Sequence, residues 1–148
     1  MNPDAMRFPL FIDLHGREAA VIGGGAVGLR RAEVLCRFGA CVTVIAPELA
    51  RELDGVRHIP RAYQPGDLTG MSLAVAATDS REVNAAAGRE ARQLGIPFNR
   101  SDCPGDCDFF FPAICEGGGL VAGVAGDGSD HRRTALAAQK IREALGEL

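Results

Sequence analysis

Three glycines in the spacing G-x-G-x-x-G carry the clearest chemical signal in the chain. Gly23, Gly25 and Gly28 directly follow an apolar run, and a helical pattern begins at Val27. In dinucleotide-binding folds the first glycine permits a tight turn, the second lets the backbone approach a pyrophosphate, and the third lets helix and strand pack closely. The helix start adds unpaired N–H groups and partial positive charge. The corner predicts a dinucleotide site; the alternative is a glycine-rich turn that binds nothing.

The residues after the next apolar run bear on which dinucleotide is bound. An acidic residue about 20 positions beyond the glycines usually contacts the ribose hydroxyls. Glu48 lies slightly past that place, and Pro47 before it could instead pack on adenine. Arg51 is near, but no basic cluster lies immediately there. The pattern favours NAD over NADP.

The elements that must position these residues alternate between strands and helices up to about residue 100. Such alternation predicts a parallel sheet with helices on both faces, a doubly wound, Rossmann-like α/β fold. Gly39 and Gly95 are expected to end the two helices, and Thr78 or Asp79 to cap the second. The predicted strands span 18–22, 41–46, 56–59, 72–77 and 96–100, and the predicted helices span 27–38 and 81–94.

The pattern changes in the last third of the chain. Two extended segments, 109–115 and 120–125, are joined by Glu116-Gly117-Gly118-Gly119 and predict a β-hairpin. A helix is expected over 134–145. A Phe-rich hairpin must cover its apolar surface, either on a second copy of the chain or on its own domain. We therefore predict a small β-hairpin plus helix after the Rossmann-like domain.

Composition excludes several classes of protein. The chain has 148 residues and a net charge of −3, which fits one domain with a small appendage and argues against general nucleic-acid binding. No apolar run reaches the roughly 20 residues that span a bilayer, and the N-terminus lacks a secretory pattern, so we expect no membrane association and a cytoplasmic location. Five cysteines argue against a disulfide framework, and the pair Cys103 and Cys107 completes no metal site.

Longer segments add a more specific signal. They are, in order, FPLFIDLHGREAAVIGGGAVGLRRAEVL, VTVIAPE, AVAATDSREVN and FNRSDCPGDCDFFFPAIC. Over residues 8–125 the chain resembles the precorrin-2 dehydrogenases, a family that forms the N-terminal module of siroheme synthases. The resemblance implies NAD-dependent oxidation of precorrin-2, a tetrapyrrole, to sirohydrochlorin. Because some members also insert Fe2+, chelation stays open.

The family's architecture gives the predicted domains a meaning. It consists of a Rossmann domain followed by a dimerisation element of strands and a helix, which agrees with the hairpin described above. The resemblance therefore implies an NAD-binding Rossmann domain at 1–108, a dimerisation element at 109–148, and a homodimer.

The resemblance also assigns site residues. The acid of the segment N-x-x-D-x-P, the family's proposed catalytic or metal-site carboxylate, matches Asp102. Asp102 also follows the fifth predicted strand, where ligands of open parallel sheets collect, although it could simply form a turn. Thr78 and Asp79 would lie near the nicotinamide, unless Asp79 is only a helix cap. The predicted cofactor-binding residues are Gly23, Gly24, Gly25, Ala26, Val27, Gly28, Pro47, Glu48, Thr78 and Asp79.

The loop GDGSDHRR departs from the family, which has a Ser-Pro there. The substrate implied by the resemblance bears eight carboxylates, so Arg132 and Arg133, with Arg100, are predicted to bind them as guanidinium forks. They could equally be solvated charges at a helix start. His131 is a second catalytic candidate, as a proton carrier or an Fe2+ ligand, or it is an exposed loop residue.

Three other functions share the glycine corner. They are a non-enzymatic NAD-sensing regulatory domain, a small dehydrogenase for an unrelated substrate, and a degenerate relative that binds without turnover. A sensor would not explain the FPLF start or the block from Asp102 to Pro112.

Overall fold

The structure, a computed structural model, describes residues 6–148. Residues 1–5, part of the stretch that lacks a secretory pattern, lie outside the described residues. The chain forms two compact units. One spans Asp13–Phe109, and the other joins Phe110–Leu148 to the described segment that ends at Ile12. In the second unit the guanidinium carbon of Arg7 lies 3.9 Å from the centre of the Phe110 ring.

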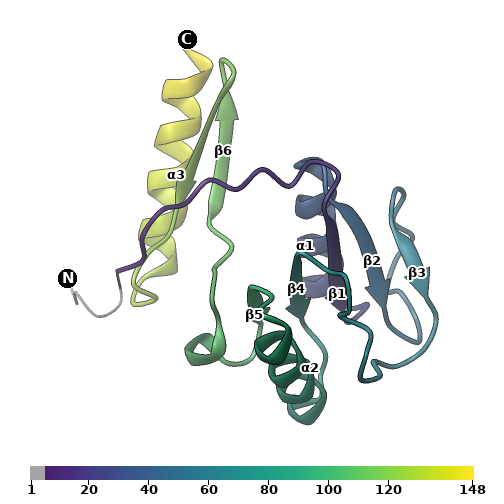
Figure 1. The fold of residues 1–148 in the computed structure, drawn as a ribbon. Coiled ribbons are helices and arrows are strands. Elements are labelled where there is room, and N and C mark those ends of the chain that lie inside the picture. Colours follow the sequence, from purple (N-terminus) through teal and green to yellow (C-terminus); the bar gives the residue numbers. More distant parts are fainter. Residues whose placement is uncertain (1–5) are drawn as a thin grey trace. The chain divides into compact units, whose positions relative to one another are not determined.

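The first unit is a parallel five-stranded sheet with the strand order β3-β2-β1-β4-β5 (Figure 1). The order reverses between β1 and β4, which is where open α/β sheets bind ligands. The predicted Rossmann-like fold class is confirmed. The elements are β1 (Glu18–Ile22), α1 (Ala26–Arg37), β2 (Cys41–Ile45), β3 (Arg57–Ile59), β4 (Leu73–Ala76), α2 (Arg81–Leu94) and β5 (Phe98–Arg100).

Both faces of the sheet are covered, so its central strands β1, β2 and β4 are mostly apolar and buried. On one face Ile22 packs in a cluster with Ala87 and Ala91 of α2. The connection between β3 and β4 has no helix. Its residue Leu68 is fully buried and belongs to the same cluster. Figure 1 shows α2 in front of the sheet and α1 behind it, as the two opposite crossovers require.

The start of α2 corrects one sequence prediction. The N-cap is Ser80, whose hydroxyl accepts a hydrogen bond from the N–H of Val83 at 3.2 Å, so the prediction of Thr78 or Asp79 was wrong. The Thr78 hydroxyl instead donates to the side-chain oxygen of Asn84 at 2.7 Å. The end of the helix agrees with its prediction, because Gly95 adopts a φ of 69° at the C-cap.

The second unit contains a hairpin of β6 (Ala113–Gly117) and β7 (Leu120–Val124) and the helix α3 (His131–Gly146). The predicted hairpin started too early, because β6 begins directly after Pro112, which has no N–H for a strand ladder. The turn is only Gly118-Gly119, both with positive φ, as two-residue hairpin turns of type I′ require.

The helix α3 begins three residues before its predicted start. Asp130 caps it, because its carboxylate accepts hydrogen bonds from the N–H groups of Arg132 and Arg133. The helix packs on the hairpin through Cys115 and Ala138, which are at most 1% exposed. None of the helices within residues 6–148 is long and apolar enough to cross a membrane.

Replacing Asp130 by Ala is expected to lower the free energy of unfolding by about 1 kcal/mol, because two N–H groups lose their cap. Urea titration followed by circular dichroism measures the change. Asp130→Asn is the matched control, since Asn caps about as well as Asp. Equal losses in the two variants would mean that the negative charge, rather than the cap, stabilises α3.

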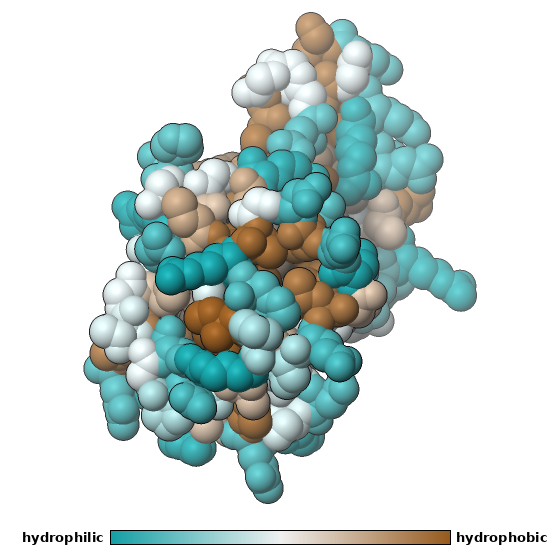
Figure 2. Space-filling view, turned by 90° about the vertical axis from the view of Figure 1, so that its right-hand side faces the viewer, coloured by the Kyte–Doolittle hydropathy of each residue, from teal (hydrophilic) through white to brown (hydrophobic). Residues whose placement is uncertain are grey.

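Apolar side chains are unevenly distributed over the surface. Figure 2 shows hydrophilic side chains over most of one face, with hydrophobic ones in smaller areas between them. Among the described residues, most of the large apolar side chains that are exposed belong to the second unit. They are Met6, Phe8, Leu10, Phe11, Ile12, Leu120, Val121, Leu136 and Leu148, against Val27 and Leu94 in the sheet unit.

Candidate active site

Two of the three motif glycines are required by close packing. Gly23 has a φ of 119°, and a Cβ atom there would lie 2.5 Å from the carbonyl oxygen of Ala77 beyond β4. A Cβ atom on Gly28 would lie 2.5 Å from the carbonyl oxygen of Gly23. These contacts let the first turn of α1 approach the carboxyl ends of β1 and β4. Both glycines therefore shape the corner.

Gly25 has a different environment, which fits a phosphate ligand. A Cβ atom there would meet nothing within 4 Å, so its lack of a side chain is not explained by packing. Gly25 is the N-cap of α1 and makes no side-chain hydrogen bond, whereas Ser80 and Asp130 cap the other two α-helices of residues 6–148. The first N–H groups of α1, including those of Ala26 and Val27, thus have no capping side chain. This is the arrangement that binds the pyrophosphate of a dinucleotide.

The loop after β2 is attached to this corner. A Cβ atom on Gly24 would lie 2.0 Å from the carbonyl oxygen of Glu48, and the N–H of Ala50 donates to the carbonyl oxygen of Gly24 at 2.8 Å. Pro47 and Glu48 are exposed beside it. The structure therefore brings together the predicted cofactor residues at 23–28 and 47–48.

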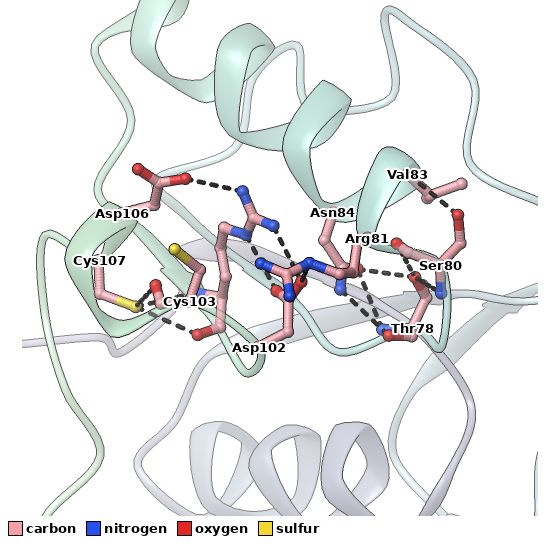
Figure 3. Close-up of polar contacts among 10 residues, drawn as sticks. Thr78, Ser80, Arg81, Val83, Asn84, Asp102, Cys103, Asp106 and Cys107 are labelled. Atoms are coloured by element: carbon pink, nitrogen blue, oxygen red, sulfur yellow. Dashed lines mark hydrogen bonds and ion pairs between the residues drawn. The ribbon is translucent and has the colours of Figure 1, made fainter. Parts of the chain in front are cut away.

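At the carboxyl end of β5, the guanidinium group of Arg100 binds two carboxylates. They belong to Asp102 and Asp106, which are labelled in Figure 3. Its Nε and Nη2 donate to the two carboxylate oxygens of Asp102 at 3.0 and 2.9 Å. Its Nη1 donates to Asp106 at 2.7 Å, from the short 3-10 helix η2 (Pro104–Asp106). The Arg100 side chain is only 6% exposed, so burial and three charged hydrogen bonds fix its position. Arg81 of α2 reaches the same cluster, with its Nε 3.7 Å from an oxygen of Asp102.

Asp102 remains partly accessible within this cluster, with 21% of its side chain exposed. The hydrogen bonds from Arg100 lower the pKa of the Asp102 carboxyl below its ordinary value, and partial burial opposes that shift without reversing it. Asp102 is therefore ionised at neutral pH. Each carboxylate oxygen has two lone pairs, so the fork of Arg100 leaves acceptor capacity for another group.

The end of β4 is fixed by a fully buried amide. The side-chain oxygen of Asn84 accepts hydrogen bonds from the N–H and hydroxyl of Thr78, and its NH2 group donates to the Thr78 carbonyl at 3.1 Å. Thr78 is thereby positioned at the same edge of the sheet as Asp102. Both residues are labelled in Figure 3. Asp79 follows and is exposed.

The remaining predicted site residues belong to the second unit. His131 is the first residue of α3, and Arg132 and Arg133 follow it in the first turn. All three are exposed, and the N–H groups of the two arginines donate to the Asp130 cap. The cluster within the sheet unit is thus made of Arg100, Asp102, Asp106 and Arg81. Sequence reasoning missed Arg81 and Asp106 because only the folded turn brings them to Asp102 and Arg100.

Comparison with known proteins shows the family of the chain. A family model described as "Putative NAD(P)-binding" matches residues 10–113. The chain is 39% identical over 144 residues to "Probable multifunctional siroheme biosynthesis protein HemA" of Ruminiclostridium josui, covering 93% of this chain and 28% of that protein. It is 43% identical over 126 residues to a siroheme synthase of Pseudomonas aeruginosa, covering 81% of this chain and 27% of that protein. The resemblance to siroheme synthases is confirmed.

The chain spans about a quarter of the length of these curated relatives. A solved structure, "SirC, precorrin-2 dehydrogenase", shares the fold with a TM-score of 0.74 at 24% identity, covering 93% of this chain and 71% of that one. The match of the family model includes the glycine corner, the whole sheet and the Asp102 cluster. The chain belongs to this NAD(P)-binding family.

Proposed function

We propose that the chain catalyses the NAD+-dependent oxidation of precorrin-2 to sirohydrochlorin. The observation that carries the proposal is Asp102, an ionised and accessible carboxylate at the carboxyl edge of the sheet that also bears the glycine corner. The names of the similar proteins supply the substrate, since they are siroheme synthases and a precorrin-2 dehydrogenase. A domain that only senses NAD would not need this carboxylate.

The loop after β2 supports NAD rather than NADP as the cofactor. A 2′-phosphate on the ribose would approach Glu48, whose negative charge disfavours it. The nearby cation, Arg51, is paired with Glu33 of α1 at 2.8 Å. The carboxylate of Glu48 and the pairing of Arg51 with Glu33 therefore favour a ribose with free hydroxyls over a ribose with a 2′-phosphate.

The reaction divides between the cofactor and the chain. The glycine corner at residues 23–28 would hold NAD+, which would supply the acceptor for a hydride from a saturated carbon of the macrocycle. Asp102 then accepts the proton that is lost as conjugation extends, so that precorrin-2 and NAD+ give sirohydrochlorin, NADH and one proton. Its side chain is 21% exposed, and Arg100 fixes its orientation. Such a positioned base contributes about 10²–10⁴-fold to a rate.

The second unit supports the proposal of a homodimer. Leu120, Val121 and Leu136 of the hairpin and α3 are between 43% and 53% exposed, which leaves apolar surface for a second copy of the chain to cover. We also propose a cytoplasmic location. All five cysteines are free thiols, which suits a reducing compartment.

An anaerobic assay tests the proposed function. Purified protein is mixed with NAD+ and freshly generated precorrin-2, and sirohydrochlorin and NADH are followed together by absorbance. Appearance of both in equal amounts is the expected result. If NAD+ binds but no product forms, while a known dehydrogenase converts the same substrate, the chain is a sensor or a degenerate relative. Adding Fe2+ afterwards, with and without protein, tests chelation separately.

The titration of Asp102 gives a prediction that needs no substrate. Because Arg100 holds the carboxylate, Asp102 is expected to titrate below its ordinary pKa of 3.8, and Arg100→Gln is expected to raise that midpoint. Since the folded-state pKa is depressed, the stability from this pair is present above pH 3.8 and is lost as pH falls through the folded-state pKa.

Carbon-13 NMR of protein with labelled Asp measures the midpoint, and Asp102→Asn assigns the signal. Arg92→Gln, an exposed arginine of the last turn of α2, is the control and should leave the midpoint unchanged. A wild-type midpoint at or above the ordinary value would show that Arg100 does not control this carboxyl.

A further inference from the structure

A surface cavity of about 560 Å³ lies beside the Asp102 cluster, entirely within the sheet unit. Three arginines line it, together with one acidic and one small residue. These are Arg81, Arg89, Arg100, Glu82 and Ala85. Arginine guanidinium groups bind carboxylates as two-pronged forks, so the two exposed arginines of this cavity, Arg81 and Arg89, indicate an anionic ligand.

The spacing of these residues follows from the helix. Arg81, Ala85 and Arg89 are four residues apart in turn, so they lie on one face of α2. At 1.5 Å per residue, the two arginines are about 12 Å apart along the axis. Ala85 between them leaves room that a longer side chain would fill. The face therefore presents two separated cations over a small apolar floor.

The cations differ in how fully they are engaged. Arg100 is buried, and Asp102 and Asp106 balance its charge, so it forms a fixed wall of the cavity. Arg81 is 76% exposed and touches the Asp102 cluster only at 3.7 Å.

Arg89 is exposed and makes no ion pair within residues 6–148. Its neighbour Glu90 is held elsewhere, since Tyr63 donates to it at 2.6 Å. Glu82 is the one carboxylate that lines the cavity, and it lies in the first turn, where the helix adds partial positive charge. Arg89 is thus the cation most available to a ligand.

We propose that Arg81 and Arg89 bind peripheral carboxylates of a polycarboxylate macrocycle. This inference rests on the proposed function and adds a substrate site to it. The site uses Arg81 and Arg89 rather than Arg100, because Asp102 and Asp106 already balance the charge of Arg100. Because Arg81 contacts both the cavity and Asp102, carboxylates held along α2 bring the ring of the same molecule next to the Asp102 carboxylate. Two separated arginines also favour ligands with several carboxylates over ligands with one.

Binding of uroporphyrin III, an octacarboxylate that is not turned over, tests the site without the reaction. Quenching of its fluorescence gives Kd for the wild type and the variants. Arg89→Gln is expected to weaken binding about 10-fold, and the double variant Arg81→Gln/Arg89→Gln about 100-fold, because each charged hydrogen bond is worth more than a neutral one. Arg89→Lys, which keeps the charge but not the fork, should fall between. Kd for NAD+ should not change.

Arg92→Gln is the matched control, since Arg92 is exposed on the same helix and does not line the cavity. Its Kd for uroporphyrin should stay within twofold of the wild type. Three results would overturn the site. The wild type and Arg89→Gln could bind uroporphyrin equally, Arg92→Gln could lose as much affinity as Arg89→Gln, or the wild type could fail to bind uroporphyrin. Absence of precorrin-2 oxidation by the wild type would refute the proposed function rather than the binding site. If the wild type does turn over precorrin-2, the weaker binding by Arg89→Gln should appear as a raised KM for precorrin-2.

Discussion

Replacing Asp102 by Asn is expected to lower kcat for precorrin-2 oxidation by about 10²–10⁴-fold, the usual contribution of a positioned base. Asn has nearly the same shape, but its amide cannot accept the proton. The buried Arg100 keeps its ion pair with Asp106 at 2.7 Å, so the substitution leaves no buried charge without a partner. The protein should therefore fold, and the loss should be in the chemical step.

Single-turnover measurement of NADH formation checks this result, with Kd for NAD+ expected to be unchanged. Asp106→Asn is the control, because Asp106 also binds Arg100 but is proposed to take no part in proton transfer. Its kcat should stay within a few-fold of the wild type. Full turnover by Asp102→Asn would rule out Asp102 as the base, whatever the control shows.

Replacing Gly25 by Ala is expected to weaken NAD+ binding at least about 10-fold, or 1.4 kcal/mol. The new methyl group would meet no protein atom within 4 Å, and the φ of −77° suits alanine, so the fold should not change. The methyl group would instead occupy the place where backbone must approach the pyrophosphate. Gly24→Ala contrasts with it, since that Cβ atom would lie 2.0 Å from the carbonyl oxygen of Glu48 and should destabilise the fold as well.

Isothermal titration with NAD+ and thermal unfolding separate the two effects. Gly25→Ala should lose affinity and keep its melting temperature, whereas Gly24→Ala should lose both. Gly105→Ala is the control, because Gly105 also faces open space but lies in η2, away from the corner. If Gly25→Ala binds NAD+ like the wild type, the pyrophosphate does not approach the chain at Gly25.

Much of the sheet unit could be predicted from the sequence because local signals there agree with the fold. The helix α2 was expected over 81–94 and has those bounds, since its apolar spacing and Gly95 mark the same element. The central strands β1, β2 and β4 are short apolar runs, and Gly23 and Pro47 mark the ends of the first two. The glycine corner was predictable because Gly23 and Gly28 allow a close approach of backbone that other residue types meet poorly, and the motif places Gly25 between them.

The parts that could not be predicted depend on contacts between residues far apart in the sequence, or on which hydroxyl group reaches a particular N–H group. Ser80 caps α2 because its hydroxyl reaches the N–H of Val83, while Thr78, which is also of a capping residue type, is held by Asn84. Substrate binding by Arg100 stays a prediction, whereas its contacts with Asp102 and Asp106 were not predicted, because only the turn after β5 brings the two carboxylates to its guanidinium group. Nothing in the local sequence of Arg81 indicates that it lies next to that cluster.

The uncapped start of α1 has a consequence for the degradation of the protein in a cell. The first N–H groups of α1 have no capping side chain, so an anion such as the pyrophosphate of NAD+ would satisfy them and stabilise the folded state. Any ligand that binds only the folded state shifts the folding equilibrium in proportion to the logarithm of its free concentration. The fraction of chains exposed to proteases would then rise when the nicotinamide pool falls. Supply of the cofactor would in this way influence the amount of folded protein.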